Sequence, residues 1–319
     1  MFFSCAAEKK DFTVNQNNLR ILAEKINNDF LRIHEAADTL AENIKILHQN
    51  KDSIIATIDT AAYEIEESTG VFYRKNINNG SAVFVSGSHP ITKKVKNETY
   101  LTEPLDDLLK EIASFPSVIQ VYYNDRFSGN RIYPAFDVLS QYEPGLVIPD
   151  YNFYYLADEE HNPEKKSLWL DELYVDPAGR GWMISALAPV YHQDTLMGVA
   201  GIDITVKTII KQYLPKNDKN TIIVDSDGKL IAASPEALFL FGMPSLKNYQ
   251  YTSTIKEEEI LGEDFNILKS KNASLRRAVE VLLNEKNGNI PRFQRADTQY
   301  GLLSAPIAEF GWYILQATE

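Results

Sequence analysis

The first 69 residues contain neither glycine nor proline, and this stretch limits the folds open to the chain more than any other feature. Thr13 and Gln16 fit a capping box at its start, and Gly70 is a suitable stop. The pattern predicts one helix over 12–69, roughly 80 Å long, serving as a spine that touches two modules or as a coiled-coil stalk for a homodimer. Its apolar residues recur at steps of three and four, the period of an α-helix: Leu19, Leu22, Ile26, Phe30, Ile33, Ala37, Leu40, Ile44, Leu47, Ile54, Ile58, Ala61 and Ile65.

Size and charge limit the classes of partner. A chain of 319 residues is long enough for two modules, each with its own core. The formal net charge of -12 argues against nucleic acid, because phosphate binding needs a basic surface. It also disfavours electrostatic adhesion to anionic lipid. No apolar run reaches the ~18 residues that a membrane span requires.

The only cysteine, Cys5, excludes an internal disulfide and a cysteine zinc cluster. Residues 2–7, followed by Glu8-Lys9-Lys10, resemble the end of a bacterial lipoprotein signal, in which a lipidated cysteine becomes the mature N-terminus. Four preceding residues are too few for a signal peptide. We therefore treat 1–11 as an anchor or tail, with Cys5 either a lipidation site or an incidental cysteine. A lipid anchor would be the only attachment to a membrane.

After Gly70 the pattern changes to strands, turns and short helices, and a similar order begins again after residue 214. We expect two α+β modules, over 70–214 and 215–319, each built on an antiparallel sheet. The periodicities predict helices at 105–112, 207–214 and 275–284. They predict strands at 118–123, 131–134, 198–206, 221–224, 229–233, 293–296, 300–306 and 312–316.

The predicted strand at 198–206 contains a charged residue, Asp203, at a position inside the strand where apolar or neutral residues are usual. Successive side chains of a strand point to opposite faces, so Ala200, Ile202 and Ile204 form a core surface. The opposite face carries Gly201 and Asp203, a gap beside a carboxylate. An ionised carboxylate inside a sheet is costly unless it is paired. Asp203 is therefore predicted to bind a cationic ligand, or else to form a structural ion pair, with Arg180 as the nearest candidate.

Aromatic and acidic residues upstream extend this candidate site. Tyr174 and Asp176 share a strand face, although Asp176 also suits the start of a turn over 176–179. Aromatic faces beside carboxylates can hold an ammonium group, and ordinary core filling is the alternative for each of them. The candidates are Tyr123, Phe153, Tyr154, Tyr155 and Trp169, with Tyr122, Tyr133, Tyr151 and Trp182 as weaker ones.

The sequence lacks the common motifs of catalysis and of cofactor binding. The five histidines are scattered, and no nucleophile elbow, phosphate-binding loop or dinucleotide fingerprint occurs. We expect no cofactor and no enzymatic activity. A hydrolase that holds a divalent metal with Asp171, Asp176 and Asp203 remains an alternative.

Taken with the long helix, these motifs resemble the extracytoplasmic double Cache (PDC-type) sensor domains of bacterial chemoreceptors, histidine kinases and cyclases. The resemblance is most specific in Trp169, Tyr174-x-Asp176, residues 189–191 and the run 198–203. It implies a long helix backing two stacked PAS-like modules, with the ligand in the membrane-distal one (70–214) and 215–319 membrane-proximal. It also implies that Tyr174, Asp176 and Asp203 bind the amine of the ligand.

One departure from the family changes the expected ligand. Amino-acid-binding members have an arginine before a Trp-Tyr pair, where it grips the carboxylate of the ligand. The matching stretch here is Asn152-Phe153-Tyr154-Tyr155, which has no arginine. A small amine without a carboxylate is therefore favoured over an α-amino acid.

The sequence thus predicts an extracytoplasmic sensor module that binds a small amine-containing or amino-acid-like ligand and passes the signal to a protein partner. The main alternative is a lipoprotein that binds a solute without signalling and delivers it to a transporter or receptor. A coiled-coil scaffold with an empty pocket is a further alternative.

Overall fold

Two compact units make up the chain, and each combines helices with an antiparallel sheet. The computed structural model describes residues 2–77, 80–176, 180–214, 219–244, 265–284 and 290–319. Among these, one unit contains residues 32–205 and the other contains 2–31 together with those from 206 onward. We expected the boundary after residue 214, whereas α7 (Val206–Tyr213) belongs to the second unit. The predicted α+β class is confirmed.

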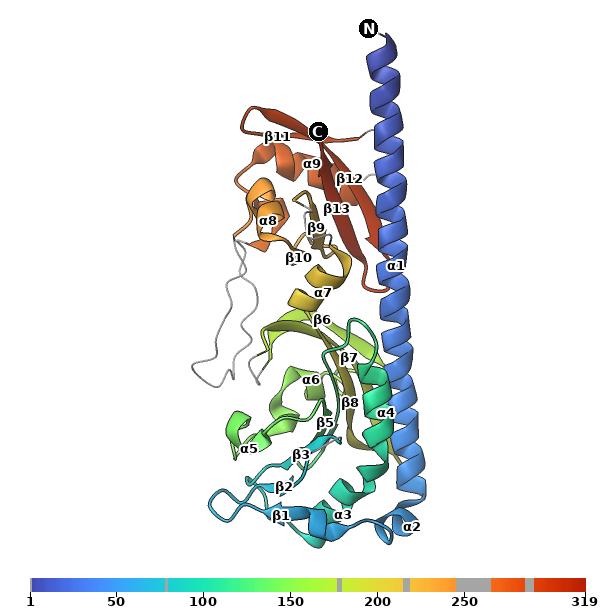
Figure 1. Ribbon diagram of the computed structural model, residues 1–319, viewed down its shortest axis with the longest axis vertical. Coiled ribbons are helices and arrows are strands. Elements are labelled where there is room, and N and C mark those ends of the chain that lie inside the picture. Colours follow the sequence, from blue (N-terminus) through green and yellow to red (C-terminus); the bar gives the residue numbers. More distant parts are fainter. Residues whose placement is uncertain (1, 78–79, 177–179, 215–218, 245–264, 285–289) are drawn as a thin grey trace. The chain divides into compact units, whose positions relative to one another are not determined.

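The long helix α1 covers Phe2–Gln49 (Figure 1). Its buried side chains follow the predicted steps of three and four from Leu19 to Ile44. The predicted capping box is wrong, because the helix begins well before Thr13. The Gln16 side chain instead donates a hydrogen bond of 2.8 Å to the carbonyl oxygen of Ser304.

The predicted end of this helix is also wrong, since α1 stops about twenty residues before Gly70. A short helix, α2 (Lys51–Ile55), and a turn, η1 (Thr60–Ala62), follow it. The Asn50 amide donates to the carbonyl of Ile46, and Asp59 accepts from the amide of Ala61. The helix therefore ends without a glycine or proline, and the Asp59 bond caps the separate turn η1.

In the described part of residues 32–205, eight strands form one antiparallel sheet in the order β1-β2-β3-β5-β4-β8-β7-β6 (Figure 1). The central strands of the sheet are buried on both faces, whereas many antiparallel sheets have one face exposed to solvent. The strands are β1 (Tyr63–Ile65), β2 (Phe72–Arg74), β3 (Ala82–Val85), β4 (Gln120–Asp125), β5 (Gly129–Tyr133), β6 (Leu168–Val175), β7 (Trp182–His192) and β8 (Thr195–Thr205).

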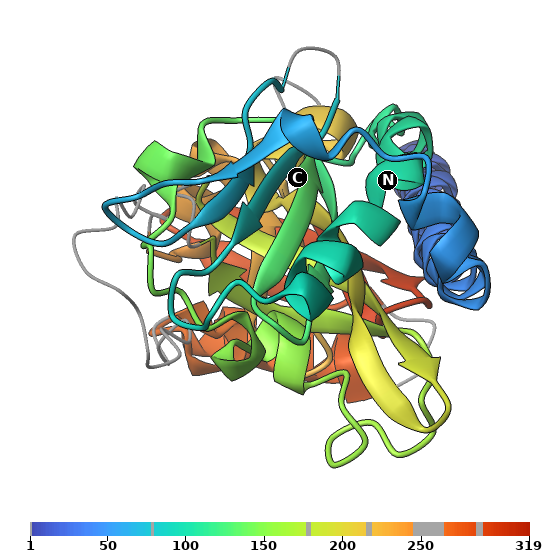
Figure 2. The ribbon, with the colours of Figure 1, turned by 90° about the horizontal axis from the view of Figure 1, so that it is seen from below.

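Helical segments cover both faces of this sheet (Figures 1 and 2). One face carries α3 (Lys93–Leu101), η2 (Glu103–Leu105) and α4 (Asp106–Ala113). The other carries α5 (Val138–Gln141), η3 (Ile148–Asp150) and α6 (Asn152–Tyr155), whose buried side chains join those of β4, β5 and β8 in one cluster. The candidate site lies on this second face.

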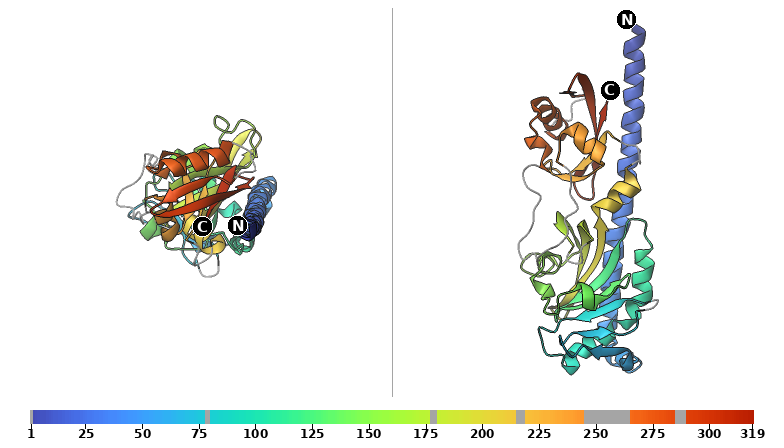
Figure 3. Two further views of the ribbon diagram at one scale, coloured as in Figure 1. Left: turned by 90° about the horizontal axis from the view of Figure 1, so that it is seen from above. Right: turned by 60° about the vertical axis from the view of Figure 1, so that its left-hand side comes forward.

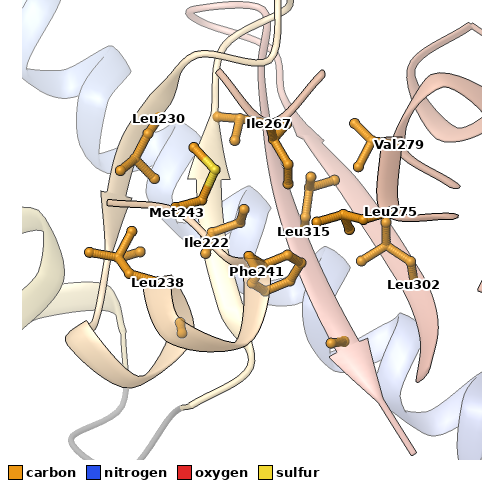
Figure 4. Close-up of a cluster of buried hydrophobic side chains, with 14 of the residues drawn as sticks. Ile222, Leu230, Leu238, Phe241, Met243, Ile267, Leu275, Val279, Leu302 and Leu315 are labelled. Atoms are coloured by element: carbon orange, nitrogen blue, oxygen red, sulfur yellow. The ribbon is translucent and has the colours of Figure 1, made fainter. Parts of the chain in front are cut away.

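The second unit is built on a five-stranded antiparallel sheet in the order β10-β9-β13-β12-β11 (Figure 3). Leu238 and Phe241 of one helix and Leu275 and Val279 of another belong to one hydrophobic cluster with side chains of the sheet (Figure 4). The elements are β9 (Thr221–Val224), β10 (Leu230–Ala233), α8 (Pro235–Phe241), η5 (Ile267–Lys269), α9 (Ala273–Asn284), β11 (Arg292–Arg295), β12 (Thr298–Ile307) and β13 (Trp312–Thr318).

Candidate functional site

A row of three polar residues crosses the centre of the eight-stranded sheet. Ser185 of β7 pairs with Asp203 of β8, and Asp203 pairs with Gln120 of β4. Residues paired across antiparallel strands point to the same face, so the three side chains are direct neighbours. All three are buried, with exposed fractions of 0% for Ser185, 1% for Asp203 and 5% for Gln120.

Hydrogen bonds converge on the Asp203 carboxylate. The Ser185 hydroxyl donates to Oδ1 at 2.5 Å, and the Gln120 amide nitrogen donates to Oδ2. The hydroxyl oxygens of Tyr174 and Ser185 are 2.7 Å apart. Because Ser185 gives its only proton to Asp203, Tyr174 must be the donor to Ser185. Tyr174, Ser185 and Asp203 therefore form one directed chain of hydrogen bonds.

Asp203 has no cationic partner among the described residues within ion-pair distance. The alternative of an ion pair with Arg180 is wrong, because the Arg180 guanidinium contacts Asp176 at 3.3 Å. Burial, reinforced by the charge of Asp176, raises the pKa of Asp203 to about 7. The hydrogen bonds from Ser185 and Gln120 only partly offset this effect. The ligand-free site thus holds its carboxylate without a counter-charge.

Asp176 opens the predicted turn and also lies at the cavity. Its carboxylate accepts from the backbone and side chain of Arg180, at 3.0 and 3.3 Å, as expected for a residue that opens a turn. It also lines the cavity beside Asp203. Residues 177–179 of that predicted turn lie outside the described ones.

The gap predicted beside Gly201 is filled. Gly201 pairs with Tyr122 of β4, whose ring lies over the glycine where a Cβ would be. An aromatic ring over a glycine in the neighbouring strand restores the buried surface that the missing side chain leaves open. The cavity at this site is therefore lined by Asp203 and not by Gly201.

The cavity at this site has a volume of about 40 Å³. Polar, aromatic and aliphatic side chains line it, and its volume is room for about three water molecules. Its lining consists of polar Gln120, Asn124, Asn130, Asp176 and Asp203, aromatic Tyr122, Tyr142, Phe153 and Tyr174, and aliphatic Ile132, Leu146 and Ile148.

The structure brings four of the eight predicted ligand-binding residues to the cavity: Asp203, Asp176, Tyr174 and Phe153. Tyr174 is a neutral donor there, because burial and the charge of Asp203 raise its pKa well above the usual value. Phe153 lies near Tyr174, with 6.1 Å between ring centroids.

The other four predicted residues lie elsewhere. Tyr123 follows Tyr122 on β4, so it points to the opposite face, beside Asp125 and Arg131. Trp169 pairs with Ala186, also on that opposite face, and its ring lies 5.8 Å from that of His34 in α1. Neither residue lines the cavity.

Tyr154 and Tyr155 are separated from Phe153 by the turn of α6. Consecutive helical residues differ by about 100° in direction, so one short helix cannot aim three aromatic rings at one point. Tyr154 is buried in the hydrophobic cluster, and the Tyr155 ring lies 5.1 Å from that of His161. Of the three aromatic residues predicted in this segment, only Phe153 lines the cavity, together with Tyr122 and Tyr174 from the strands.

Sequence reasoning missed Gln120, Asn124, Asn130, Tyr142 and Ser185. One signal was available, because Gln120, Tyr122 and Asn124 alternate along a strand whose other residues are mostly apolar. The contribution of Ser185 required the register of β7 on β8.

Three predictions concern metals and the membrane. Among the described residues no group of three or more His, Cys, Asp or Glu could hold a metal ion, and the Asp171 side chain lies outside them. The Cys5 side chain also lies outside the described ones. Within the described part of the chain, no helix has the length and apolarity to cross a membrane.

No protein-family model matches this sequence, and no match was found among curated protein sequences. Solved structures do match over the whole chain. The ligand-binding domain of the Pseudomonas fluorescens chemoreceptor CtaA, in complex with L-isoleucine, has a TM-score of 0.54 at 14% identity, covering 100% of this chain and 97% of its own. The chain has the fold of a chemoreceptor ligand-binding domain.

Two further structures are similar. The extracellular domain of mmHK1S-Z2, a protein assigned as a histidine kinase, has a TM-score of 0.53 at 12% identity and covers 96% of each chain. The ligand-binding domain of the Campylobacter jejuni chemoreceptor Tlp3, in complex with L-valine, has a TM-score of 0.51 at 11% identity, covering 97% of this chain and 94% of its own. The predicted double Cache architecture is confirmed at the level of the fold.

Proposed function

We propose that this protein is an extracytoplasmic sensor module whose cavity binds a small ligand carrying one positively charged amino group. The observation that carries the proposal is Asp203, a buried carboxylate at the cavity that has hydrogen-bond donors but no cationic partner among the described residues. Asp176 is neutralised by Arg180, which leaves one net negative charge at the site. An ammonium group would supply the missing charge in a medium of low dielectric constant, where ion pairing is strong.

The lining favours an amine over an α-amino acid. None of the twelve lining residues is a lysine, arginine or histidine. Arg180, which contacts the lining residue Asp176, also lies over the Phe136 ring at 4.7 Å. A carboxylate in the cavity would face Asp203 and Asp176 without a cationic partner, which costs free energy.

The signalling part of the proposal rests on the fold. CtaA and Tlp3 are chemoreceptors whose domains were solved with amino acids, and mmHK1S-Z2 is an extracellular domain. By analogy, ligand binding to this chain would shift its conformational equilibrium and so inform a signalling partner. The shift is limited to the difference in affinity of the ligand for the two states. A binding role, without catalysis, is part of this proposal.

Calorimetric titration of the full chain with a panel of small amines and amino acids tests the binding step. We expect the wild type to bind at least one amine, and Asp203→Asn to lose most of that affinity. Asp125→Asn is the matched control, because Asp125 is also fully buried in this sheet but lies on the opposite face. Equal affinity of the wild type and Asp203→Asn for the same amine would contradict the proposal.

Two predictions from the sequence stay predictions. A homodimer through α1 would appear as twice the monomer mass in light scattering. Lipidation of Cys5 would appear in the intact mass of the protein purified from membranes of a bacterial host.

A further inference from the structure

Gln120 has an unpaired hydrogen-bond acceptor at the cavity. Its side chain is 95% buried, it pairs with Asp203 across β4 and β8, and it lines the cavity. The amide nitrogen donates to Asp203, which turns the amide oxygen away from that carboxylate. Among the described residues no donor reaches this oxygen.

A buried carbonyl oxygen without a donor destabilises the ligand-free site. The ladder bonds of β4 occupy the neighbouring backbone groups, so a donor has to come from the cavity. The ionised form of Asp203 keeps the amide in this orientation, because a carboxylate accepts from the nitrogen and repels the oxygen. A donor that also carries a positive charge would satisfy both side chains.

We infer that Gln120 makes the cavity selective for a primary ammonium over a quaternary one. This inference rests on the proposed function and adds a second recognition residue to Asp203. A primary ammonium has three N–H donors, enough for the Asp203 carboxylate and the Gln120 oxygen together. A quaternary ammonium has none, so it leaves the Gln120 oxygen unpaired.

The aromatic rings that line the cavity would by themselves favour a quaternary ammonium. Tyr122, Tyr142 and Phe153 line the same cavity, and aromatic faces attract quaternary ammonium groups. The hydrogen bond decides the outcome, because a bond between a charged donor and a buried acceptor is worth about tenfold to a hundredfold in affinity. A primary ammonium can also lie against these rings, so it makes the cation–π contact in addition to the hydrogen bond.

The test uses two pairs of probes that differ only in N-methylation. Ethanolamine is compared with choline, and propylamine with N,N,N-trimethylpropylammonium, by calorimetric titration of the full chain. We expect the wild type to bind the primary amine of each pair about tenfold or more tightly. In Gln120→Met the primary amine should lose that advantage, while the affinity for the quaternary amine changes little.

Two further variants keep the test decisive. Gln141→Met makes the same substitution on the exposed helix α5 and should keep the wild-type ratio. Gln120→Asn retains an amide but shortens its reach, so it should lower the ratio even if Gln120→Met does not fold. Thermal unfolding of each variant separates a change in selectivity from a loss of folding.

The outcomes separate this inference from the proposed function. A wild type that binds both members of a pair equally, or a Gln120→Met protein that keeps the wild-type ratio, overturns the role of Gln120 while amine binding stands. A wild type that binds none of the four probes overturns both. A preference for the primary amine that disappears in Gln120→Met supports both.

Discussion

Gly201 and Tyr122 face each other across β8 and β4, and the ring of Tyr122 occupies the space that any side chain at position 201 would need. This pairing determines where the cavity lies, because it closes the sheet surface beside Asp203 and leaves open only the region in front of it. The sequence alone suggests that Gly201 leaves space for a ligand. In the structure the Tyr122 ring fills that space, so the role of this glycine is structural.

Replacing Gly201 by alanine should therefore destabilise the fold. We expect Gly201→Ala to lower the free energy of unfolding by about 1–3 kcal/mol, the usual cost of overpacking a core. In a Tyr122→Leu background the ring is gone, so the same substitution should cost much less. Urea denaturation of the four proteins measures this coupling. An equal cost in both backgrounds would show that the ring is not the source of the strain.

The affinity for an amine should depend on pH with a defined sign. Burial raises the pKa of Asp203 to about 7 in the ligand-free protein, and an ammonium binds the ionised carboxylate. Below pH 7 the affinity should fall about tenfold per pH unit, and above it the affinity should level off. Asp203→Asn should show weak binding that is independent of pH in this range. Titrations at pH 5, 6, 7 and 8 check this, and a flat wild-type profile would contradict it.

The stability of the ligand-free protein should depend on pH in the opposite direction. A carboxyl group whose pKa is higher in the folded state binds a proton more readily there, so its contribution falls as the pH rises from about 4 to about 7. Asp203, with a pKa of about 7, and Asp125, raised by burial to about 6, both act this way. Asp203→Asn should therefore gain melting temperature relative to the wild type as the pH rises. If the difference between the two proteins stays constant from pH 4 to 8, this account of Asp203 is wrong.

Arg131 of β5 should be essential for the stability of the same unit. Its side chain is 2% exposed, and it donates to Asp106 at 2.8 Å, to Ser81 at 2.9 Å and to the Tyr63 hydroxyl at 2.8 Å. Its removal would leave the Ser81 and Tyr63 oxygens without this buried donor, and Asp106 with Arg74 as its remaining cationic partner. We expect Arg131→Met to cost about 3–5 kcal/mol in unfolding free energy.

The neighbouring Arg74 provides the control for that substitution. It also contacts Asp106, at 2.5 Å, but its side chain is 18% exposed, so water already screens part of its ion pairing. Arg74→Met should cost clearly less than Arg131→Met. Equal losses in chemical denaturation would mean that burial of the cation does not determine its contribution.

The sequence predicts the elements of this fold better than the contacts within the site. Alternation along β8 correctly separates Asp203 from Ile202, because strand periodicity is a local property. The predicted end of α1 is wrong, because the helix stops at Gln49 and a short helix and a turn follow it without a glycine or proline to mark the change. Gln120 and Ser185 join Asp203 only through strand register, which depends on pairing between distant segments.

A crystal structure of the protein with a bound primary amine tests the central claim most directly. Our account predicts that the ammonium nitrogen lies about 2.7–3.2 Å from a carboxylate oxygen of Asp203 and from the amide oxygen of Gln120. An amine bound in the cavity with its nitrogen turned away from Asp203, or bound elsewhere on the chain, would contradict it.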